Sequence, residues 1–324
     1  MKRTITLLAA CAALSFAVTS ASAETWDMPL AYPATNFHSE NAAKFAQCVL
    51  EGTGGTLEIV IHPNGSLFDG SDIKRAVQTG QAAIGERLIS AHANENPLFG
   101  IDSIPFLATS FEASEKLWAA AEEKMKELLE RQNLVYIYAV PWPPQGLYAK
   151  KEINGIEDLQ GVKFRAYNAA TARIAELAGM APVQIEAADL SQALATGVVD
   201  SFISSGSTGV DSKVWESLTH FYDVQAWLPR NIVFVNKAAF EALDEETQEA
   251  LQECGDQARA EGTRIAEELT AGYLEELAAN GMVVGPPSEQ LREELAGLGT
   301  KMTEEWIASA GEEGAAIIEA YRAQ

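Results

Sequence analysis

The stretch 158–200 constrains the fold most, because it repeats a strand followed by a helix. Val162–Phe164 alternates apolar and polar side chains as a strand does, and Asn168 is a typical N-cap for the helix-periodic residues Ala169–Leu177. A second strand-like run and a second helix follow within residues 183–196. This order of elements predicts an α/β fold built on an open sheet.

Arg165 lies where the first of these strands ends. In open α/β sheets the carboxyl ends of the strands face the ligand crevice. A guanidinium there can hold a carboxylate through two parallel hydrogen bonds and stays charged at any working pH. Arg165 is therefore a candidate anchor for an anionic ligand, and the alternative is a structural ion pair with a neighbouring acid.

The same alternation extends along the rest of the chain. Helix-periodic segments occur at 36–50, 71–79 and 111–131, and strand-like runs at 57–61, 83–86 and 134–140. The turn Pro141–Gly146 is rigid and carries Trp142. We interpret it as the first crossing between two lobes.

A second crossing is expected at 221–236, where extended sequence returns from the second lobe. We therefore predict a lobe 1 at 24–146, a lobe 2 at 147–227, and a return to lobe 1 with C-terminal helices at 228–324. Two lobes joined by several hinge strands are the architecture of clam-shell periplasmic binding proteins, in which a ligand bridges the lobes and stabilises closure.

The N-terminus is typical of a secretory signal peptide. Lys2 and Arg3 precede an apolar stretch that ends in Ala21-Ser22-Ala23, an A-x-A cleavage site. Cleavage near Ala23 would place the mature chain in the periplasm. Lipid attachment at Cys11 is the competing interpretation. No later apolar stretch is long enough to span a bilayer, which argues against an integral membrane protein.

The formal net charge is −23, with 46 acidic and 23 basic side chains. Binding to nucleic acid or to anionic lipid requires basic patches, so we exclude nucleic-acid partners. The acids recur along helical segments such as 241–253 and 261–276, where they predict a solvated outer face.

Cysteine and histidine are sparse. Cys48 and Cys254 can form one disulfide in an oxidising compartment, but the sequence does not show whether they approach each other. The four histidines are scattered, so we expect no metal site. No P-loop, dinucleotide-binding or nucleophile-elbow motif occurs, and we expect no cofactor.

Several motifs taken together resemble one family, the solute-binding subunit of tripartite ATP-independent periplasmic (TRAP) transporters, of the dicarboxylate-receptor type. They are residues 55–59, 77–85, 105–107, 158–165 and 192–200. The resemblance covers nearly the whole mature chain. It implies that Arg165 pairs with a ligand carboxylate, and that the ligand is delivered to membrane subunits that use an ion gradient and no ATP.

The chain departs from the family pattern in its polar lining. Asn168 lies where the family often has a ligand-facing amide, and Ser204 lies where many members have an asparagine, which argues against a bulky polyhydroxylated ligand. Trp142, Tyr167 and Trp227 are candidate pocket walls, although each can equally be a core aromatic.

Glu86 is the sharpest acidic candidate, because an acid at the end of a buried strand needs a cationic partner. That partner can be Arg87, Arg165 or an amine on the ligand. Gln145 is a second polar candidate, and His38 and Glu40 complete the set.

The favoured function is a periplasmic receptor for a small organic acid or zwitterion, and we expect a monomer. The first alternative is the same receptor specific for a small amine or amino alcohol, with Glu86 holding the ammonium. A secreted enzyme that uses Glu86 with Asp189 or Glu186 as acid and base is the least supported alternative, because nothing supplies a nucleophile–base pair or a metal centre.

Overall fold

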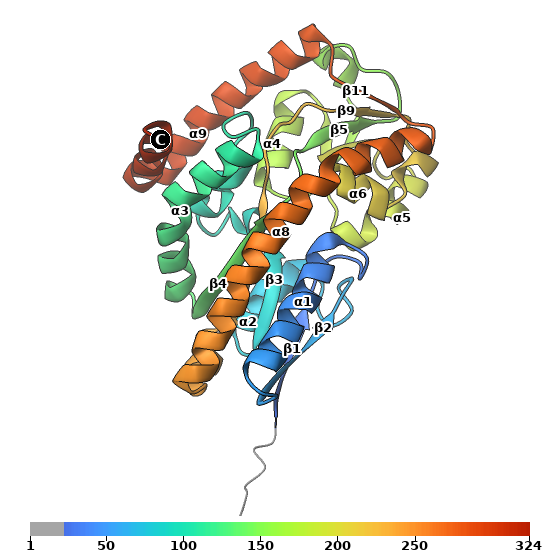
Figure 1. The fold of residues 1–324 in the computed structure, drawn as a ribbon. Helices are drawn as coiled ribbons and strands as arrows, with labels where there is room; N and C mark the ends of the chain where they lie inside the picture. The colour runs from blue at the N-terminus through green and yellow to red at the C-terminus, as the bar shows by residue number, and fades with distance from the viewer. Residues whose placement is uncertain (1–22) are drawn as a thin grey trace, which may run out of the picture.

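The structure, a computed structural model, describes residues 23–324 (Figure 1). The predicted signal peptide, residues 1–23, lies outside the described part except for Ala23, and so does the alternative lipidation site at Cys11. The remaining chain forms the predicted α/β fold, with three sheets covered by helices. Within 23–324, no helix combines the length and the apolar character that crossing a membrane requires.

The first lobe contains two small sheets. Strands β1 (Glu24–Pro29) and β2 (Leu57–His62) pair in parallel, and an antiparallel sheet has the order β3 (Ile84–Leu88), β10 (Arg230–Asn236), β4 (Leu134–Pro141). Its helices are α1 (Phe37–Gly52), α2 (Ile73–Gln78) and α3 (Phe111–Arg131). Asn36 and Ser110 start α1 and α3 by accepting backbone N–H bonds. Strands β3 and β10 are buried along their whole length, so they form the centre of this core.

The second lobe is built on a six-stranded sheet. Its order is β11 (Val283–Gly285), β9 (His220–Tyr222), β5 (Gly146–Ala149), β8 (Ser201–Ser204), β6 (Lys163–Ala166), β7 (Ala181–Gln184), with helices α4 (Ala169–Leu177), α5 (Leu190–Ala195) and α6 (Gly206–Asp211) beside it. Strand β6 runs parallel to both β7 and β8. The carboxyl ends of these three strands therefore meet at one edge of the sheet.

The last part of the chain is helical, as predicted, but it belongs to both lobes. After α7 (Lys237–Ala242), the helix α8 (Glu245–Ala279) contacts α1 and β4 in the first lobe and α6 and β11 in the second (Figure 1). Strand β11 joins the second sheet, and α9 (Glu289–Arg322) contacts both α3 and α4. The expected return to lobe 1 over 228–324 therefore applies to β10, to α7 and to the part of α8 that contacts α1 and β4, and not to the whole segment. The reason is that α8 is long enough to span both lobes.

Two segments cross between the lobes side by side. One joins β4 to β5 and the other joins β9 to β10. They are paired through backbone hydrogen bonds, from Trp142 N to the Pro229 carbonyl at 2.7 Å and from Gln145 N to the Trp227 carbonyl at 3.0 Å. Residues 142–145 and 226–229 therefore form a two-stranded hinge.

Gly146 starts strand β5 at this hinge. A Cβ atom there would collide with the ring of Phe221 and would lie 2.8 Å from the Tyr222 carbonyl oxygen. Only glycine allows β5 to approach β9 so closely at the point where the chain enters the second lobe.

Several local predictions are confirmed. Asn168 caps α4 by accepting the Thr171 backbone N–H, and the Thr171 side chain completes a capping box. The predicted bounds of α3 and α4 agree with the structure. The open question of a disulfide is also answered, because Cys48 and Cys254 are bonded with their Cα atoms 5.8 Å apart, which links α1 to α8.

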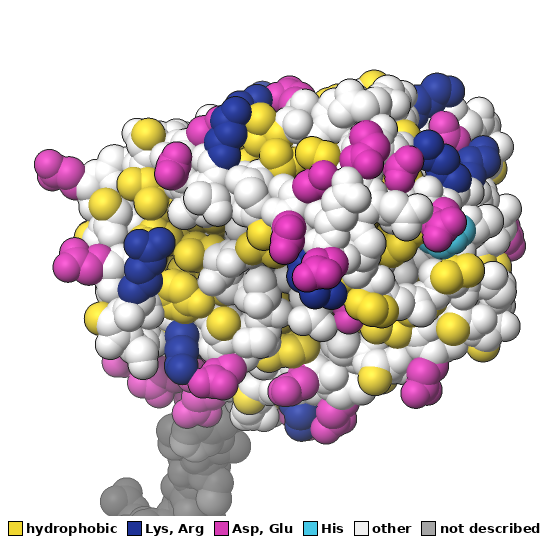
Figure 2. Space-filling model, turned by 90° about the horizontal axis from the view of Figure 1, so that it is seen from above, with side chains coloured by type: hydrophobic (Ala, Val, Ile, Leu, Met, Phe, Trp, Pro, Cys, Tyr) yellow, Lys and Arg dark blue, Asp and Glu magenta, His cyan; other side chains and the backbone are white. Residues whose placement is uncertain are grey.

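Acidic side chains outnumber basic ones in this chain, 46 to 23. Seen from above, acidic side chains are scattered over the molecule with fewer lysines and arginines between them (Figure 2). On this face the basic side chains form no continuous patch of the kind that nucleic acid binds.

Candidate ligand pocket between the lobes

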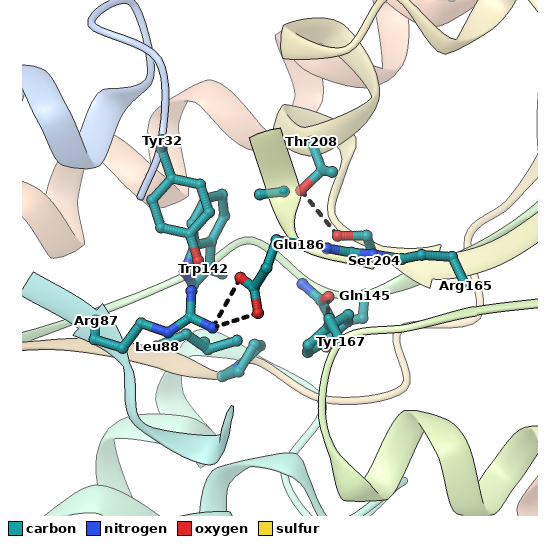
Figure 3. A pocket seen from close by; sticks show the side chains of 12 residues that line it. Tyr32, Arg87, Leu88, Trp142, Gln145, Arg165, Tyr167, Glu186, Ser204 and Thr208 are labelled. Atoms are coloured by element: carbon teal, nitrogen blue, oxygen red, sulfur yellow. Dashed lines mark hydrogen bonds and ion pairs between the residues drawn. The ribbon is translucent and has the colours of Figure 1, made fainter. Parts of the chain in front are cut away.

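A small pocket lies where the two lobes and the hinge meet (Figure 3). The centre of a water molecule can occupy only about 30 Å³ of it, so a larger ligand enters when the lobes separate or side chains move. The lining comes from lobe 1 (Tyr32, Arg87, Leu88), from the hinge (Trp142, Gln145, Pro229) and from lobe 2 (Arg165, Tyr167, Glu186, Ala187, Ser204, Thr208). Three parallel strands of lobe 2 end at this pocket, which is where open α/β sheets bind ligands.

Arg165 is buried in this pocket. Its Nε donates to the Ile185 carbonyl at 2.9 Å, and its guanidinium lies over the Tyr167 ring, 4.9 Å from the centroid. Burial lowers the pKa of Arg165, because desolvation opposes the charged form. No carboxylate pairs with it among the described residues, so the alternative of a structural ion pair is not what the structure shows. The remaining N–H groups are available for an anion.

Arg87 and Glu186 approach each other across the pocket from opposite lobes. The Nη2 of Arg87, on β3, donates to both oxygens of Glu186, which follows β7, at 3.1 and 2.9 Å (Figure 3). The pair therefore neutralises one of the two arginines of the pocket and joins the lobes.

A chain of hydrogen bonds supports the floor of the pocket. The indole N–H of Trp227 donates to the Tyr167 hydroxyl, which in turn donates to Gln145 Oε1, each at 3.1 Å. The Gln145 amide donates to the Pro143 carbonyl at 2.9 Å. Burial raises the pKa of Tyr167, so its hydroxyl keeps its proton. Gln145 and Tyr167, two of the candidates from the sequence, line the pocket. Trp227 does not line it and is fully buried behind Tyr167.

Trp142 forms an aromatic wall. Its indole ring packs edge-on against Tyr32 with centroids 4.7 Å apart, and it contacts the ring of His38 at 4.3 Å. The indole N–H donates to Asn231 Oδ1 at 2.8 Å, which fixes the ring orientation. His38 does not line the pocket but supports Trp142 from behind. Burial lowers its pKa well below the ordinary value, so the ring is neutral.

The expectation that Glu86, on β3, pairs with an arginine or an amine on the ligand is wrong. Its side chain is buried behind Trp142, accepts a hydrogen bond from Asn231 at 2.5 Å, and lies 3.6 Å from His38 Nδ1. Burial raises the pKa of Glu86 to about 7. Burial disfavours the charged carboxylate, so the Glu86 carboxyl takes up a proton near neutral pH and does not pair with a cation.

Three other candidates have different positions. Asn168 does not line the pocket. Its side-chain amide donates to the hydroxyls of Ser90 and Ser103, and these hydrogen bonds join lobe 2 to lobe 1. Ser204 lines the pocket, and its hydroxyl donates to Thr208 at 2.8 Å. Glu40 is exposed on α1. The direct roles of the lining residues in ligand binding remain predictions.

Seven lining residues were absent from the candidates for ligand contact, and four of them, Tyr32, Arg87, Glu186 and Thr208, have polar side chains. Tyr32 and Thr208 carry no local signal in the sequence. Arg87 was considered only as a partner of Glu86, although neighbours on a strand point to opposite faces and only one of the two can face the pocket. Glu186 was considered only as a catalytic acid or base, and its position two residues beyond a strand of the parallel set is the signal that could have identified it.

The family model for bacterial extracellular solute-binding protein, family 7, matches residues 31–309. The chain belongs to this family. The resemblance to TRAP solute-binding subunits is thereby confirmed, and so is the two-lobed α/β fold. The homologues of this solute-binding protein are receptors of transporters and not enzymes.

Two solved structures are similar to this solute-binding protein over nearly the whole chain. A marine metagenome TRAP solute binding protein, specific for pyroglutamate and in complex with co-purified pyroglutamate, is 55% identical, with 93% of this chain and 99% of that chain covered and a TM-score of 0.92. An extracytoplasmic solute receptor of Bordetella pertussis that binds pyroglutamic acid is 47% identical, with 93% and 100% covered and a TM-score of 0.91.

A more distant relative is a C4-dicarboxylate-binding periplasmic protein of Rhodobacter capsulatus. It is 26% identical over 287 residues, which cover 79% of this chain and 83% of that protein.

Proposed function

We propose that this protein is a periplasmic receptor that binds pyroglutamate in the pocket between its lobes and delivers it to the membrane subunits of a TRAP transporter. Pyroglutamate is a small cyclic acid with a single carboxylate. The proposal rests on the buried guanidinium of Arg165, which faces the pocket without a carboxylate partner in the described structure. The pyroglutamate-binding proteins that are 55% and 47% identical support this choice of acid.

The pocket favours an acid over the amine of our alternative. Its charged lining consists of Arg87, Arg165 and Glu186, and the single acid already pairs with Arg87. An ammonium group would therefore meet an unpaired guanidinium, whereas a carboxylate would pair with it. Glu86, the residue that was expected to hold an amine, does not reach the pocket.

The size and shape of the pocket also favour a compact ligand. Trp142 and Tyr32 close one side with aromatic rings, and the hydroxyls of Ser204 and Thr208 are bonded to each other. Ligand binding then joins groups from both lobes and the hinge, so the closed form is stabilised by the ligand it encloses. A membrane partner can recognise this closed form.

The test is the affinity for pyroglutamate of the wild type and of two Arg165 variants, measured by calorimetry after any co-purified ligand has been removed by unfolding and refolding. Arg165→Ala is expected to weaken binding by about 2–5 kcal/mol, or roughly 30-fold to several thousandfold, because a buried charge-assisted pair is lost. Arg165→Lys keeps the charge but loses the two-pronged geometry, and we expect an intermediate loss.

Arg264→Ala is the matched control, because Arg264 lies on the exposed side of α8 and pairs only with acids of the same helix. It should bind as the wild type does. The proposal would be abandoned if Arg165→Ala kept wild-type affinity, or if mass spectrometry of the purified protein and calorimetry both showed no binding of pyroglutamate.

A further inference from the structure

The charges that line the pocket sum to a single positive charge. Arg87 and Arg165 are the cations and Glu186 is the acid, within the described residues that line it. Glu186 neutralises the charge of Arg87, because the Nη2 of Arg87 donates to both carboxylate oxygens. The Nε of Arg87 is buried and has no hydrogen-bond partner among the described residues. Within the described residues, Arg165 donates only to a backbone carbonyl. One guanidinium is therefore left for an anion.

The Arg87–Glu186 pair is held in a confined place. The side chains are only 4% and 24% exposed, respectively. Gly70 packs directly against them, since a Cβ on Gly70 would lie 2.7 Å from Arg87 Nη1 and 2.7 Å from Glu186 Oε2. This confinement leaves little room for Glu186 to turn away while the lobes are closed.

The same two residues also line a larger, second groove, beside Ser71 and Lys74. Because Arg87 and Glu186 border both spaces, their ion pair forms part of the wall between the pocket and this groove. A ligand held on Arg165 therefore shares this small pocket with the carboxylate of Glu186.

We infer that Glu186 makes the pocket selective for monocarboxylates and excludes dicarboxylates. The inference rests on the proposed function, because it takes a carboxylate on Arg165 as given. A second carboxylate would meet either the negative charge of Glu186 or an Arg87 that Glu186 already occupies. Two unpaired like charges about 4 Å apart near a protein surface disfavour binding by on the order of a thousandfold, and the charge of Arg87 beside Glu186 offsets part of this effect. Selection here comes from a repulsive element as well as from the attractive anchor.

The discriminating ligands are glutarate and its monoamide, which differ only in that one carboxylate is replaced by a neutral amide. Calorimetry at pH 7.5 would compare them on the wild type and on Glu186→Gln. We expect the wild type to bind glutarate at least about 100-fold more weakly than the monoamide, a part of the full like-charge effect because Glu186 is partly solvated. Glu186→Gln frees Arg87 and should strengthen glutarate binding at least tenfold.

Two further variants separate charge from other causes. Glu176→Gln makes the same change on the exposed side of α4 and should leave both affinities unchanged. The double variant Arg87→Gln/Glu186→Gln returns the pocket to one positive charge, and it should lose the gain in glutarate binding. It also tests the inference if the single variant folds poorly, since it removes the buried charge of Arg87 that Glu186→Gln alone would leave unpaired.

The inference is overturned if glutarate and its monoamide bind the wild type equally, or if Glu186→Gln, folded by circular dichroism, gains less than about threefold for glutarate. Failure of the proposed ligand would give a different result. In that case the wild type would not bind pyroglutamate, while the gain of glutarate binding in Glu186→Gln would still appear.

Discussion

The buried carboxyl of Glu86 makes a specific prediction about stability and pH. Its pKa is about 7 in the folded protein, against an ordinary value of 4.5. As the pH rises from 4.5 to 7, the unfolded chain gives up its proton before the folded chain does, so folding becomes less favourable over this window. The stability due to the neutral carboxyl is complete below pH 4.5 and is lost above pH 7.

The magnitude follows from the same two values. Their difference corresponds to about 3 kcal/mol of unfolding free energy, since one pKa unit is about 1.4 kcal/mol. Glu86→Gln removes the titration but keeps an oxygen that can accept the hydrogen bond from Asn231. At pH 8 the variant should therefore be more stable than the wild type by up to about 3 kcal/mol, and at pH 4.5 the two should be nearly equal.

Urea unfolding at pH 4.5, 6 and 8 measures this difference. Other buried acids, such as Asp102 with a pKa of about 7, shift the stability of both proteins alike and cancel in the comparison. Glu58→Gln, an exposed change on β2, is the control, and its difference in stability from the wild type should not depend on pH. A stability difference for Glu86→Gln that is the same at pH 4.5 and pH 8 would refute the reasoning. Pyroglutamate affinity should change less than about threefold, because Glu86 lies behind Trp142.

Two further predictions concern the scaffold. Replacing Cys48 and Cys254 together by alanine should lower the unfolding free energy by up to about 5 kcal/mol, because the disulfide closes a loop with a sequence separation of 206. A loss below about 1 kcal/mol in chemical unfolding would contradict this prediction. Gly146→Ala should destabilise the protein by about 1–3 kcal/mol or more, since the added methyl meets a carbonyl oxygen of β9 at 2.8 Å; an unchanged melting temperature would show that the hinge can yield there.

The local structure was readable from the sequence, because it depends on interactions over a few residues. Asn168 and the periodic residues after it specify α4 through a cap and an apolar face, and α3 is specified in the same way. The position of Arg165 near the end of a short strand of lobe 2 was likewise visible, since strand ends are marked by where the alternation stops.

The sequence does not show which of two neighbouring residues on a strand faces the pocket. Glu86 and Arg87 are adjacent on one buried strand, and the sequence does not say which face of that strand looks into the pocket. The structure turns Arg87 to the pocket and Glu86 to the core behind Trp142. Trp227 lies behind Tyr167 for the same kind of reason, since an aromatic in a hinge can face either side.

The sequence by itself determined the α/β class, the elements around Arg165 and, through several motifs together, the family. Only the tertiary structure decided that Arg87 and Glu186, 99 residues apart, meet across the lobes and leave Arg165 as the available guanidinium. The physical reason is range. Caps, periodicity and turns act between near neighbours in the chain, whereas the charge of a pocket depends on which distant side chains the packing of two lobes brings together.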